Sequence, residues 1–370
     1  MKIGIIELCS DTHYTPVIAR ARVFLYGNNE IKVFVNQDMV ENLKSISKEK
    51  NIEIIPRGKK ENMYHFLKKI EKEKFDILFI TTLQKHYLTF LTFNPKKTGA
   101  TVNFALHNVN EWIGGLKIYG IKKFIIKILR KIMLNKCDNI SVGSQSLKDY
   151  VLEKFDFKKP IMVIPFIMYE PKKDLSGDKE KLKVIVPGTL SEGRREYLKM
   201  FDAYDNLSDD NKKKFSLELL GAPSRNRNSR TDEIIDKCKK MGDGVIFYER
   251  FLTAKEYNER LMKSDLVFGP FKIEFGGSKG EIYGLSKDTG VNFNMIAGAK
   301  PGLLPEKFVN FKELGSSTLT FNDYKDAFDK IIGLSMDKKK VSELKKKALK
   351  NSKCFSAESV RKRLMDEGLI

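Results

Sequence analysis

The sequence contains few cysteines, and none of them lies close to another. Cys9, Cys137, Cys238 and Cys354 are far apart, and no Cys-x-x-Cys pair occurs. Zinc sites and disulfide frameworks need cysteines that are paired at regular spacing. The pattern therefore argues against both, and it favours reduced thiols in a cytoplasmic protein.

Long apolar segments are absent as well. A membrane-spanning helix needs a run of about eighteen apolar residues, and the chain has no such run. The apolar run within residues 1–11 is too short for a signal peptide. We expect it to form a β strand.

Phosphate-loop and nucleic-acid-binding motifs are missing too. The glycine-rich segment 276–280 lacks the Gly-x-x-x-x-Gly-Lys-Ser/Thr spacing of a P-loop. RNP-like aromatic patterns, zinc-finger spacing and a basic disordered arm do not occur. We expect no nucleic-acid partner, although a basic nucleic-acid-binding protein remains an alternative that a salt-dependent shift of labelled duplex would support.

Positive charge is abundant. The 370 residues include 68 Lys and Arg against 48 Asp and Glu, which gives a formal net charge of +20. This charge favours an anionic partner, such as a phosphorylated substrate, an anionic membrane surface or nucleic acid. Lysine enrichment from genome composition or a thermophilic source would explain it without a partner.

Short β-rich runs alternate with helical patterns along the chain. The runs are 2–8, 31–35, 52–56, 76–82, 101–107, 139–144, 161–166, 182–187, 215–220, 245–248, 265–269, 302–305 and 318–321. Such alternation predicts an α/β fold with parallel sheets covered on both faces.

The polar stretch 169–181 interrupts this alternation and predicts a linker. We therefore expect two Rossmann-like domains that face each other across a cleft. The N-terminal domain would cover 1–168 and the C-terminal domain 182–345, followed by a helical tail at 346–370. Ligands of parallel sheets bind beyond the carboxyl ends of the strands, so the site is expected in the cleft.

Residues 265–305 predict a phosphate site. They are typical of a strand, a glycine-rich loop, a helix that begins near Thr289 and a second strand. The first N–H groups of a helix are unpaired, and the helix dipole favours negative charge there. Lys287 adds a positive charge beside them.

Segments of both halves resemble a known family. In the C-terminal half they are 184–204, 217–223, 249–271, 293–305 and 355–367, and in the N-terminal half 105–112 and 137–151. In their order and spacing these segments resemble the GT-B glycosyltransferases, of the retaining-type group 1 superfamily that uses nucleotide sugars.

The resemblance implies an acceptor-binding N-terminal domain and a nucleotide-sugar-binding C-terminal domain. It implies a glycosyltransferase with a nucleotide-diphosphate sugar as donor and no further cofactor. The Asp-x-Asp pair that binds metal in some such enzymes is absent. We therefore expect metal-independent transfer, in which basic side chains and a helix N-terminus stabilise the leaving diphosphate.

The donor site departs from the usual motif of the family. Ser286 and Asn294 replace the two glutamates, and 286–290 resembles the Ser/Thr-Gly step of a subset of the superfamily. The expected donor-binding residues are Thr189, Arg194, Arg195, Gly221, Lys287, Asp288, Thr289, Gly290 and Asn294. The alternatives are a solvated first helical turn for the two arginines and a packing position for Gly290.

His107 and Glu281 are the catalytic candidates. His107 ends a predicted strand at its ligand-binding edge, which suits a hydrogen bond to a sugar hydroxyl or acid–base work. Glu281 would orient a sugar or act as a base. The alternatives are a structural histidine and a solvated loop glutamate. His13, Asn108 and Asn110 are expected on the acceptor side, and no metal ligands are expected.

The segment 117–136 predicts a basic amphipathic helix. It has seven basic residues and no acidic one. The apolar face is expected to pack on the domain core, and comprises Ile118, Ile121, Phe124, Ile125, Ile128, Leu129 and Ile132. Ile126, Met133 and Leu134 would lie among the lysines on the outer face. Such a face suits an anionic lipid surface, whereas an ordinary helix packed on the sheet is the alternative.

The sequence thus predicts transfer of a sugar to a lipid-linked, glycan or polysaccharide acceptor by a peripheral protein on the inner membrane face. A nucleotide-sugar epimerase of the same fold is the second candidate, and it would need acidic groups placed for proton abstraction.

Overall fold

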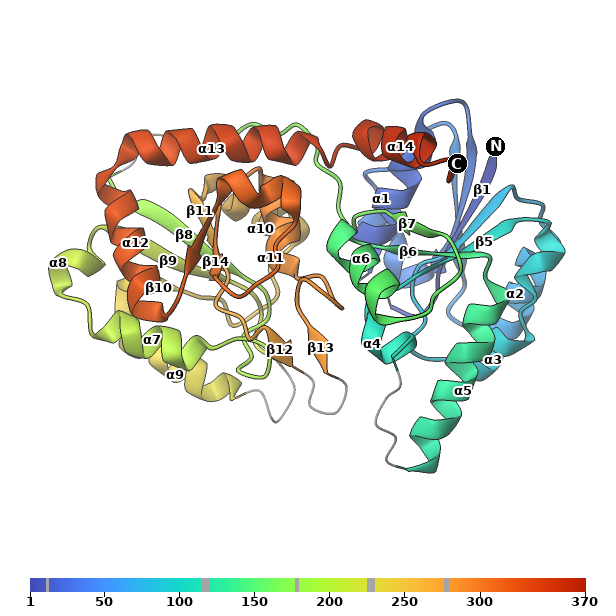
Figure 1. The fold of residues 1–370 in the computed structure, drawn as a ribbon, viewed down its shortest axis with the longest axis horizontal. Coiled ribbons are helices and arrows are strands. Elements are labelled where there is room, and N and C mark those ends of the chain that lie inside the picture. The colour runs from blue at the N-terminus through green and yellow to red at the C-terminus, as the bar shows by residue number, and fades with distance from the viewer. Residues whose placement is uncertain (11–12, 115–119, 177–179, 225–229, 276–279) are drawn as a thin grey trace.

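The computed structural model describes all residues except 11–12, 115–119, 177–179, 225–229 and 276–279. The side chains of Lys122 and Lys123 are also outside the description. Two parallel sheets form two α/β domains that lie side by side (Figure 1). This confirms the predicted fold class. Among the described residues, no helix has both the length and the apolar character that a bilayer crossing requires.

The N-terminal sheet has seven strands in the order β3-β2-β1-β4-β5-β6-β7. Its strands are β1 (Lys2–Glu7), β2 (Glu30–Asn36), β3 (Ile52–Arg57), β4 (Ile77–Ile80), β5 (Thr101–Ala105), β6 (Asn139–Val142) and β7 (Ile161–Val163). Its helices are α1 (Tyr14–Leu25), α2 (Met63–Ile70), α3 (Tyr87–Thr92), α4 (Val109–Trp112), α5 (Ile121–Lys136) and α6 (Gln145–Lys154).

The C-terminal sheet has six strands in the order β10-β9-β8-β11-β14-β15. They are β8 (Leu182–Pro187), β9 (Phe215–Leu220), β10 (Val245–Ile246), β11 (Leu266–Phe268), β14 (Gly302–Pro305) and β15 (Thr318–Phe321). A separate antiparallel hairpin joins β12 (Glu274–Phe275) to β13 (Glu281–Ile282). The helices are α7 (Tyr197–Asp205), α8 (Asp209–Lys212), α9 (Thr231–Lys240), α10 (Ala254–Lys263), α11 (Gly290–Gly298), α12 (Tyr324–Met336), α13 (Lys338–Lys353) and α14 (Ala357–Asp366).

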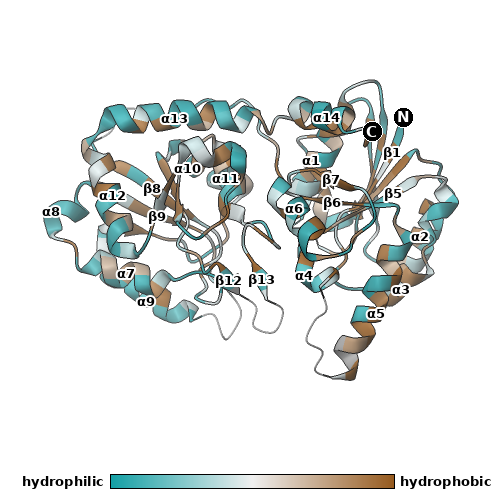
Figure 2. Cartoon of the chain, viewed as in Figure 1, coloured by the Kyte–Doolittle hydropathy of each residue, from teal (hydrophilic) through white to brown (hydrophobic). Residues whose placement is uncertain are grey.

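The central strands are apolar because helices cover both of their faces. In β1, Ile3, Ile5 and Ile6 are fully buried, and Ile5 and Ile6 belong to the cores on opposite sides of the sheet. In Figure 2 the hydrophobic colours gather on the strands of both sheets, whereas most helices carry hydrophilic residues. The sequence pattern found these strands because burial on both faces requires uninterrupted apolar runs.

The C-terminal end of the chain joins the two domains. Helix α13 runs along the C-terminal domain, and α14 lies beside α1 of the N-terminal domain (Figure 1). Lys148 of α6 forms a 2.7 Å ion pair with Glu367, and the Tyr169 N–H donates to the Phe355 carbonyl. Helix α14 therefore packs on the N-terminal domain, although it follows the C-terminal domain in the sequence.

Helix α5 has the opposite orientation from the predicted one. Ile121, Phe124, Ile125, Ile128 and Ile132 are exposed. Met133 is buried, and Ile126 and Leu134 are partly buried. The prediction that the apolar stripe faces the core is therefore wrong, and Ile118 lies outside the described residues. The inner face instead follows Arg130 and Met133, which pack toward α3 and α4.

Candidate functional site

A cavity of about 310 Å³ lies where the two domains meet, within the size range of ligand sites. The N-terminal domain supplies one wall, mainly from residues at or just after the ends of β4 and β5, together with Arg130 of α5. The C-terminal domain supplies Arg194 and Lys287. We call this space the interdomain cavity. It lies beyond the carboxyl ends of β4 and β5, as the topology of parallel sheets predicts.

His107 lines this cavity and is held in one tautomer. Its Nε2 lies 3.0 Å from the Thr81 carbonyl oxygen. A carbonyl only accepts hydrogen bonds, so Nε2 carries the hydrogen and Nδ1 remains an acceptor. The ring stacks on Phe166 at 4.2 Å. Burial lowers the pKa of His107 to about 3, so the imidazole is neutral at physiological pH. This state suits hydrogen bonding and not proton transfer.

His13 supports His107. It precedes α1, its Nδ1 lies 3.1 Å from the Thr82 hydroxyl oxygen, and its ring stacks on His107 at 5.4 Å. Burial and the charge of Lys287 lower the pKa of His13. The two rings therefore form a neutral pair, of which only His107 lines the interdomain cavity.

Glu111 and Arg130 form an ion pair on the cavity wall. Arg130 Nη2 lies 2.6 Å from Glu111 Oε1, and Nη1 donates to the Glu111 carbonyl at 2.9 Å. The guanidinium lies over the rings of Tyr87 and Trp112, at 5.6 and 5.3 Å from their centroids. Asn108 Nδ2 donates to Glu111 Oε2 at 2.7 Å. These contacts fix a planar cation at the edge of the cavity.

The sequence did not single out Glu111 or Arg130 as site residues. Arg130 is the only arginine of a helix whose other basic residues are lysines. A guanidinium makes several directed hydrogen bonds, which an ammonium cannot match. That difference was the available indication that Arg130 faces inward.

The C-terminal wall is cationic. Lys287 Nζ donates to Asn108 Oδ1 across the domain boundary. Arg194 is exposed toward solvent and interacts with the Tyr283 hydroxyl. With Arg130 on the opposite wall, three cationic residues line the cavity, against one carboxylate, Glu111, among the described lining residues. The site therefore favours an anionic ligand.

Arg195 and the glycines at the ends of β8 and β9 form a tight backbone arrangement. Arg195 Nη2 donates to the Pro187 carbonyl at 2.8 Å. A Cβ at Gly188, where φ is +110°, would lie 1.8 Å from Arg195 Nη2, and one at Gly221 would lie 1.9 Å from the Gly188 oxygen. Thr189 follows this turn and is exposed. Arg195 thus holds the turn and does not line the cavity.

Helix α11 begins with an exposed residue, Gly290. Thr289 caps it, and the Val291 N–H donates to the Thr289 hydroxyl at 3.3 Å. A Cβ at Gly290 would meet nothing within 4 Å, so packing does not require a glycine there. Asn294 donates to the Gly290 carbonyl at 2.6 Å and accepts from the Tyr257 hydroxyl at 2.9 Å. The positive end of the helix dipole is therefore exposed at Gly290, which favours a negative charge there.

Glu281 and Asp288 lie in the domain interface. Glu281 accepts from the Glu111 N–H at 2.9 Å and from the Ser286 hydroxyl at 2.5 Å. Asp288 Oδ1 accepts from the Ser144 hydroxyl at 2.8 Å, and burial raises the pKa of Asp288 to about 7. Burial also raises the pKa of Glu281. The alternative that Glu281 is a solvated loop glutamate is wrong, since the residue is buried. Glu281 does not line the interdomain cavity.

Asn110 takes part in the same interface. Its Nδ2 donates to the Gly280 carbonyl at 2.7 Å, and its Oδ1 accepts from the Tyr150 hydroxyl at 3.0 Å. Asn110 does not line the interdomain cavity. The rest of the glycine-rich loop, 276–279, lies outside the described residues.

A buried polar network supports the N-terminal wall, and the sequence pattern did not reveal it. Glu7 is fully buried and accepts from the Cys9 N–H and the Thr81 hydroxyl, at 2.9 and 2.8 Å. Burial raises the pKa of Glu7 to about 7. Arg20 is also fully buried and donates to the Ser141 hydroxyl at 3.1 Å. Charged residues inside an apolar strand and helix were the available indication of this network.

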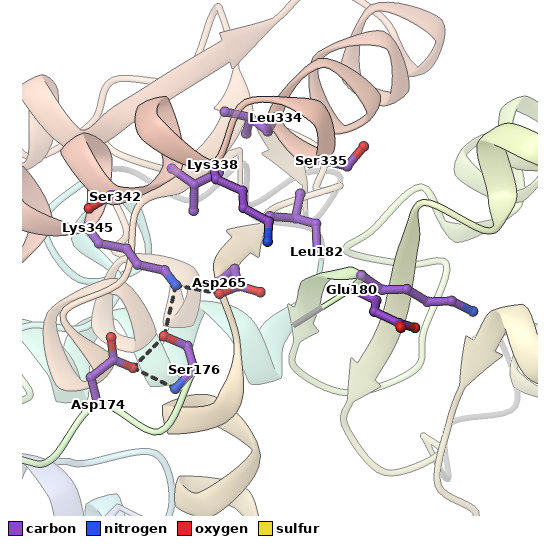
Figure 3. Close-up of a pocket in the computed structure, with 12 residues that line it drawn as sticks. Asp174, Ser176, Glu180, Leu182, Asp265, Leu334, Ser335, Lys338, Ser342 and Lys345 are labelled. Carbon is purple, nitrogen blue, oxygen red and sulfur yellow. Dashed lines mark hydrogen bonds and ion pairs between the residues drawn. The ribbon is translucent and has the colours of Figure 1, made fainter. Parts of the chain in front are cut away.

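A second cavity, of about 370 Å³, lies at the amino ends of strands in the C-terminal sheet (Figure 3). It adjoins Leu182 and Asp265, at the amino ends of β8 and β11. Lys345 Nζ lies 2.5 Å from Asp265 Oδ1 and 2.8 Å from the Ser176 hydroxyl, which also donates to Asp174. Asp174 and Asp265 are therefore already paired, and the place of the cavity in the fold does not favour a ligand site.

Comparison with known proteins identifies the fold. No protein-family model and no curated protein matches the sequence. Anabaena HepE in complex with UDP is similar over 99% of both chains, with a TM-score of 0.67 and 12% identity. A glycosyltransferase from Rickettsia africae has a TM-score of 0.62 and 16% identity, over 99% of this chain and 97% of that one.

The lipopolysaccharide outer core galactosyltransferase WaaB, in its apo form, is similar over 99% of this chain and 98% of its own. Its TM-score is 0.57 at 13% identity. These proteins share both domains with this chain, and the predicted GT-B fold is therefore confirmed.

Proposed function

We propose that this chain transfers a sugar from a nucleotide-diphosphate sugar to a lipid-linked or polysaccharide acceptor at the cytoplasmic face of the membrane. The observation that carries the proposal is the interdomain cavity. Arg194 and Lys287 of the C-terminal domain and His107 of the N-terminal domain line the same space. HepE has been solved with UDP-glucose bound, which supports a nucleotide sugar as the donor class.

The cationic wall suits the chemistry of glycosyl transfer. As the glycosidic bond to the diphosphate breaks, negative charge grows on the leaving group. Lys287, Arg194 and the N–H groups at the start of α11 would stabilise that charge. Among the described residues, no group of three His, Cys, Asp or Glu is arranged to hold a metal ion. We therefore propose that these groups act without a metal.

The N-terminal wall suits recognition of the transferred sugar and the acceptor. His107 Nδ1 is an acceptor for a sugar hydroxyl, because Nε2 is bonded to the Thr81 carbonyl. Asn108 and the pair Glu111–Arg130 present further polar groups beside it. Each of these groups is fixed by a second contact, which reduces the entropy lost when a ligand binds.

The test measures release of nucleoside diphosphate from a panel of nucleotide sugars, with lipid-linked and polysaccharide acceptors. Replacing Arg194 and Lys287 by Ala should lower kcat/KM by at least about tenfold for each residue, roughly 1.4 kcal/mol. The matched control is Lys325→Ala, which removes an exposed lysine of α12 outside the cavity.

Turnover of the double variant at the wild-type rate would reject the proposed site. Conversion of the nucleotide sugar to its epimer without an acceptor would instead favour the isomerase alternative.

A further inference from the structure

Helix α5 carries an exposed apolar stripe that no described element covers. Its residues follow the spacing i, i+3, i+4, i+7 and i+11, which places them on one side of an α-helix. The exposed fractions are 80% for Ile121, 52% for Phe124, 46% for Ile125, 43% for Ile128 and 40% for Ile132. We call these five residues the apolar stripe. Apolar surface of this kind marks an interaction site on a soluble protein.

The helix projects from the domain. Figure 1 shows the N-terminal end of α5 extending beyond the rest of the N-terminal domain, and Figure 2 shows hydrophobic segments along its length. The opposite side of the helix is anchored, because Met133 is buried and Lys136 donates to the carbonyls of Leu91 and Phe93. One side of α5 is thus anchored to the domain near the end of the helix, and the stripe lies on the other side.

Every charged residue of helix α5 is basic. The helix contains Lys122, Lys123, Lys127, Arg130, Lys131 and Lys136 and no acidic residue. Lys127 and Lys131 are exposed, and their positions lie along one flank of the stripe on a helical wheel. An apolar stripe flanked by lysines complements a bilayer whose head groups are anionic.

The opposite face of the same helix reaches the interdomain cavity. Arg130 lines that cavity and binds Glu111 and Tyr87. One helix therefore connects the outer apolar stripe to the wall that faces a ligand. A molecule anchored in the bilayer at the stripe would have its polar head close to this wall.

We propose that the apolar stripe of α5 inserts into the interface of an anionic bilayer, and that this brings the polar head of a membrane-anchored acceptor to the interdomain cavity. The acceptor part rests on the proposed glycosyl transfer, whereas the docking part does not. A second copy of this chain is a poorer occupant, because a symmetric pairing of α5 would oppose lysines to lysines.

The experiment is cosedimentation of the full chain with vesicles. One set contains phosphatidylcholine alone, and the other contains phosphatidylcholine and phosphatidylglycerol at about three to one. The protein should bind the anionic vesicles, dissociate as salt rises and leave the neutral vesicles unbound. Ile125→Ser with Ile128→Ser should weaken binding by about tenfold or more, because both side chains would insert as apolar groups.

The matched control is Leu152→Ser with Leu349→Ser. These leucines are exposed on α6 and α13, so the same loss of exposed apolar surface occurs away from α5. A charge pair completes the set: Lys127→Gln with Lys131→Gln should weaken anionic binding, whereas Lys346→Gln with Lys347→Gln on the lysine-rich α13 should not. Circular dichroism and thermal melting establish that each variant is folded.

Equal binding to neutral and anionic vesicles, no binding to either, or unchanged binding of the α5 variants would overturn the proposal. So would concentration-dependent dimerisation that the Ile125→Ser, Ile128→Ser variant abolishes. Binding of a nucleoside diphosphate, followed in the same variants by thermal shift, separates this result from the proposed function. Lost vesicle binding with an unchanged nucleotide shift assigns the defect to docking alone.

Discussion

At the scale of single residues, His107 has an environment that fixes its role. Its Nε2 is bonded to a backbone carbonyl, and burial lowers its pKa to about 3. We predict that His107→Ala lowers kcat by about ten- to a hundredfold, the cost of a lost hydrogen bond to the reacting sugar. Donor affinity should change by less than about threefold. Steady-state kinetics together with donor binding would measure both.

The pH profile gives an independent check of this role. Because His107 does not titrate near neutral pH, His107→Asn should leave the shape of the pH profile of kcat unchanged between about pH 5 and 8. Loss of one limb of the profile in this variant would assign His107 to proton transfer.

Asp288 carries a prediction about stability. Burial raises the pKa of this carboxyl from 3.8 to about 7, and its Oδ2 has no hydrogen-bond partner. Between pH 3.8 and about 7 the unfolded chain releases this proton whereas the folded chain keeps it, so stability falls as the pH rises through that window. Asp288→Asn should therefore increase the free energy of unfolding at pH 8 by roughly 1 to 3 kcal/mol, which raises the melting temperature. At pH 4 the melting temperature should change little.

Asp174→Asn is the matched control for this prediction. Although burial opposes it, hydrogen bonds from Lys300 and Ser176 lower the pKa of Asp174 to about 2. Asp174 thus contributes stability at neutral pH, and its replacement should lower the melting temperature at pH 8. The same direction of change in both variants would contradict the assignment of Asp288 as a costly buried charge.

At the scale of elements, Gly221 after β9 and Gly290 at the start of α11 differ in the space around their Cα atoms. A Cβ at Gly221 would clash with backbone, whereas a Cβ at Gly290 would meet open space at the start of α11. We predict that Gly221→Ala destabilises the fold by roughly 1 to 3 kcal/mol. Gly290→Ala should melt at or slightly above the wild-type temperature, yet bind a nucleoside diphosphate less tightly. Unchanged nucleotide affinity of Gly290→Ala would exclude close approach of the phosphate to this helix.

The sequence pattern predicted where helices and strands lie better than it predicted which side of each helix is buried. The strands were predictable because burial in a parallel sheet demands apolar runs such as that of β1. The orientation of α5 was not, because an apolar stripe has the same spacing whether it faces a core or a partner. Only the structure shows that Arg130 and Met133 fill the inner face.

The candidate site shows the same limit. The sequence singled out Lys287, Arg194 and His107 from their positions at strand ends and a helix N-terminus, and the structure brings them to one cavity. The partners of Glu281 and Asp288 were not predictable, since the Glu111 N–H and Ser144 are more than a hundred residues away in sequence. Those contacts depend on how the two domains meet.

At the scale of the whole molecule, the two domains are joined through the 280–288 loop and through the end of the chain. The 280–288 loop binds α4 and the start of α6, Lys287 reaches Asn108, and the chain end packs α14 against α1. A ligand that bridges both walls would add contacts only in the folded, assembled state. Nucleotide binding should therefore stabilise the protein as a unit.

The most direct test of a diphosphate site in this cavity is thermal melting of the full chain with a panel of nucleoside diphosphates in EDTA. At about a hundred times Kd, a bound nucleotide adds roughly 2.7 kcal/mol of stability, so at least one member should raise the melting temperature by several degrees. Arg194→Ala with Lys287→Ala should abolish that rise, and Lys325→Ala should retain it. The account would be contradicted by no rise with any nucleotide, by a rise that requires a divalent metal, or by an undiminished rise in the double variant.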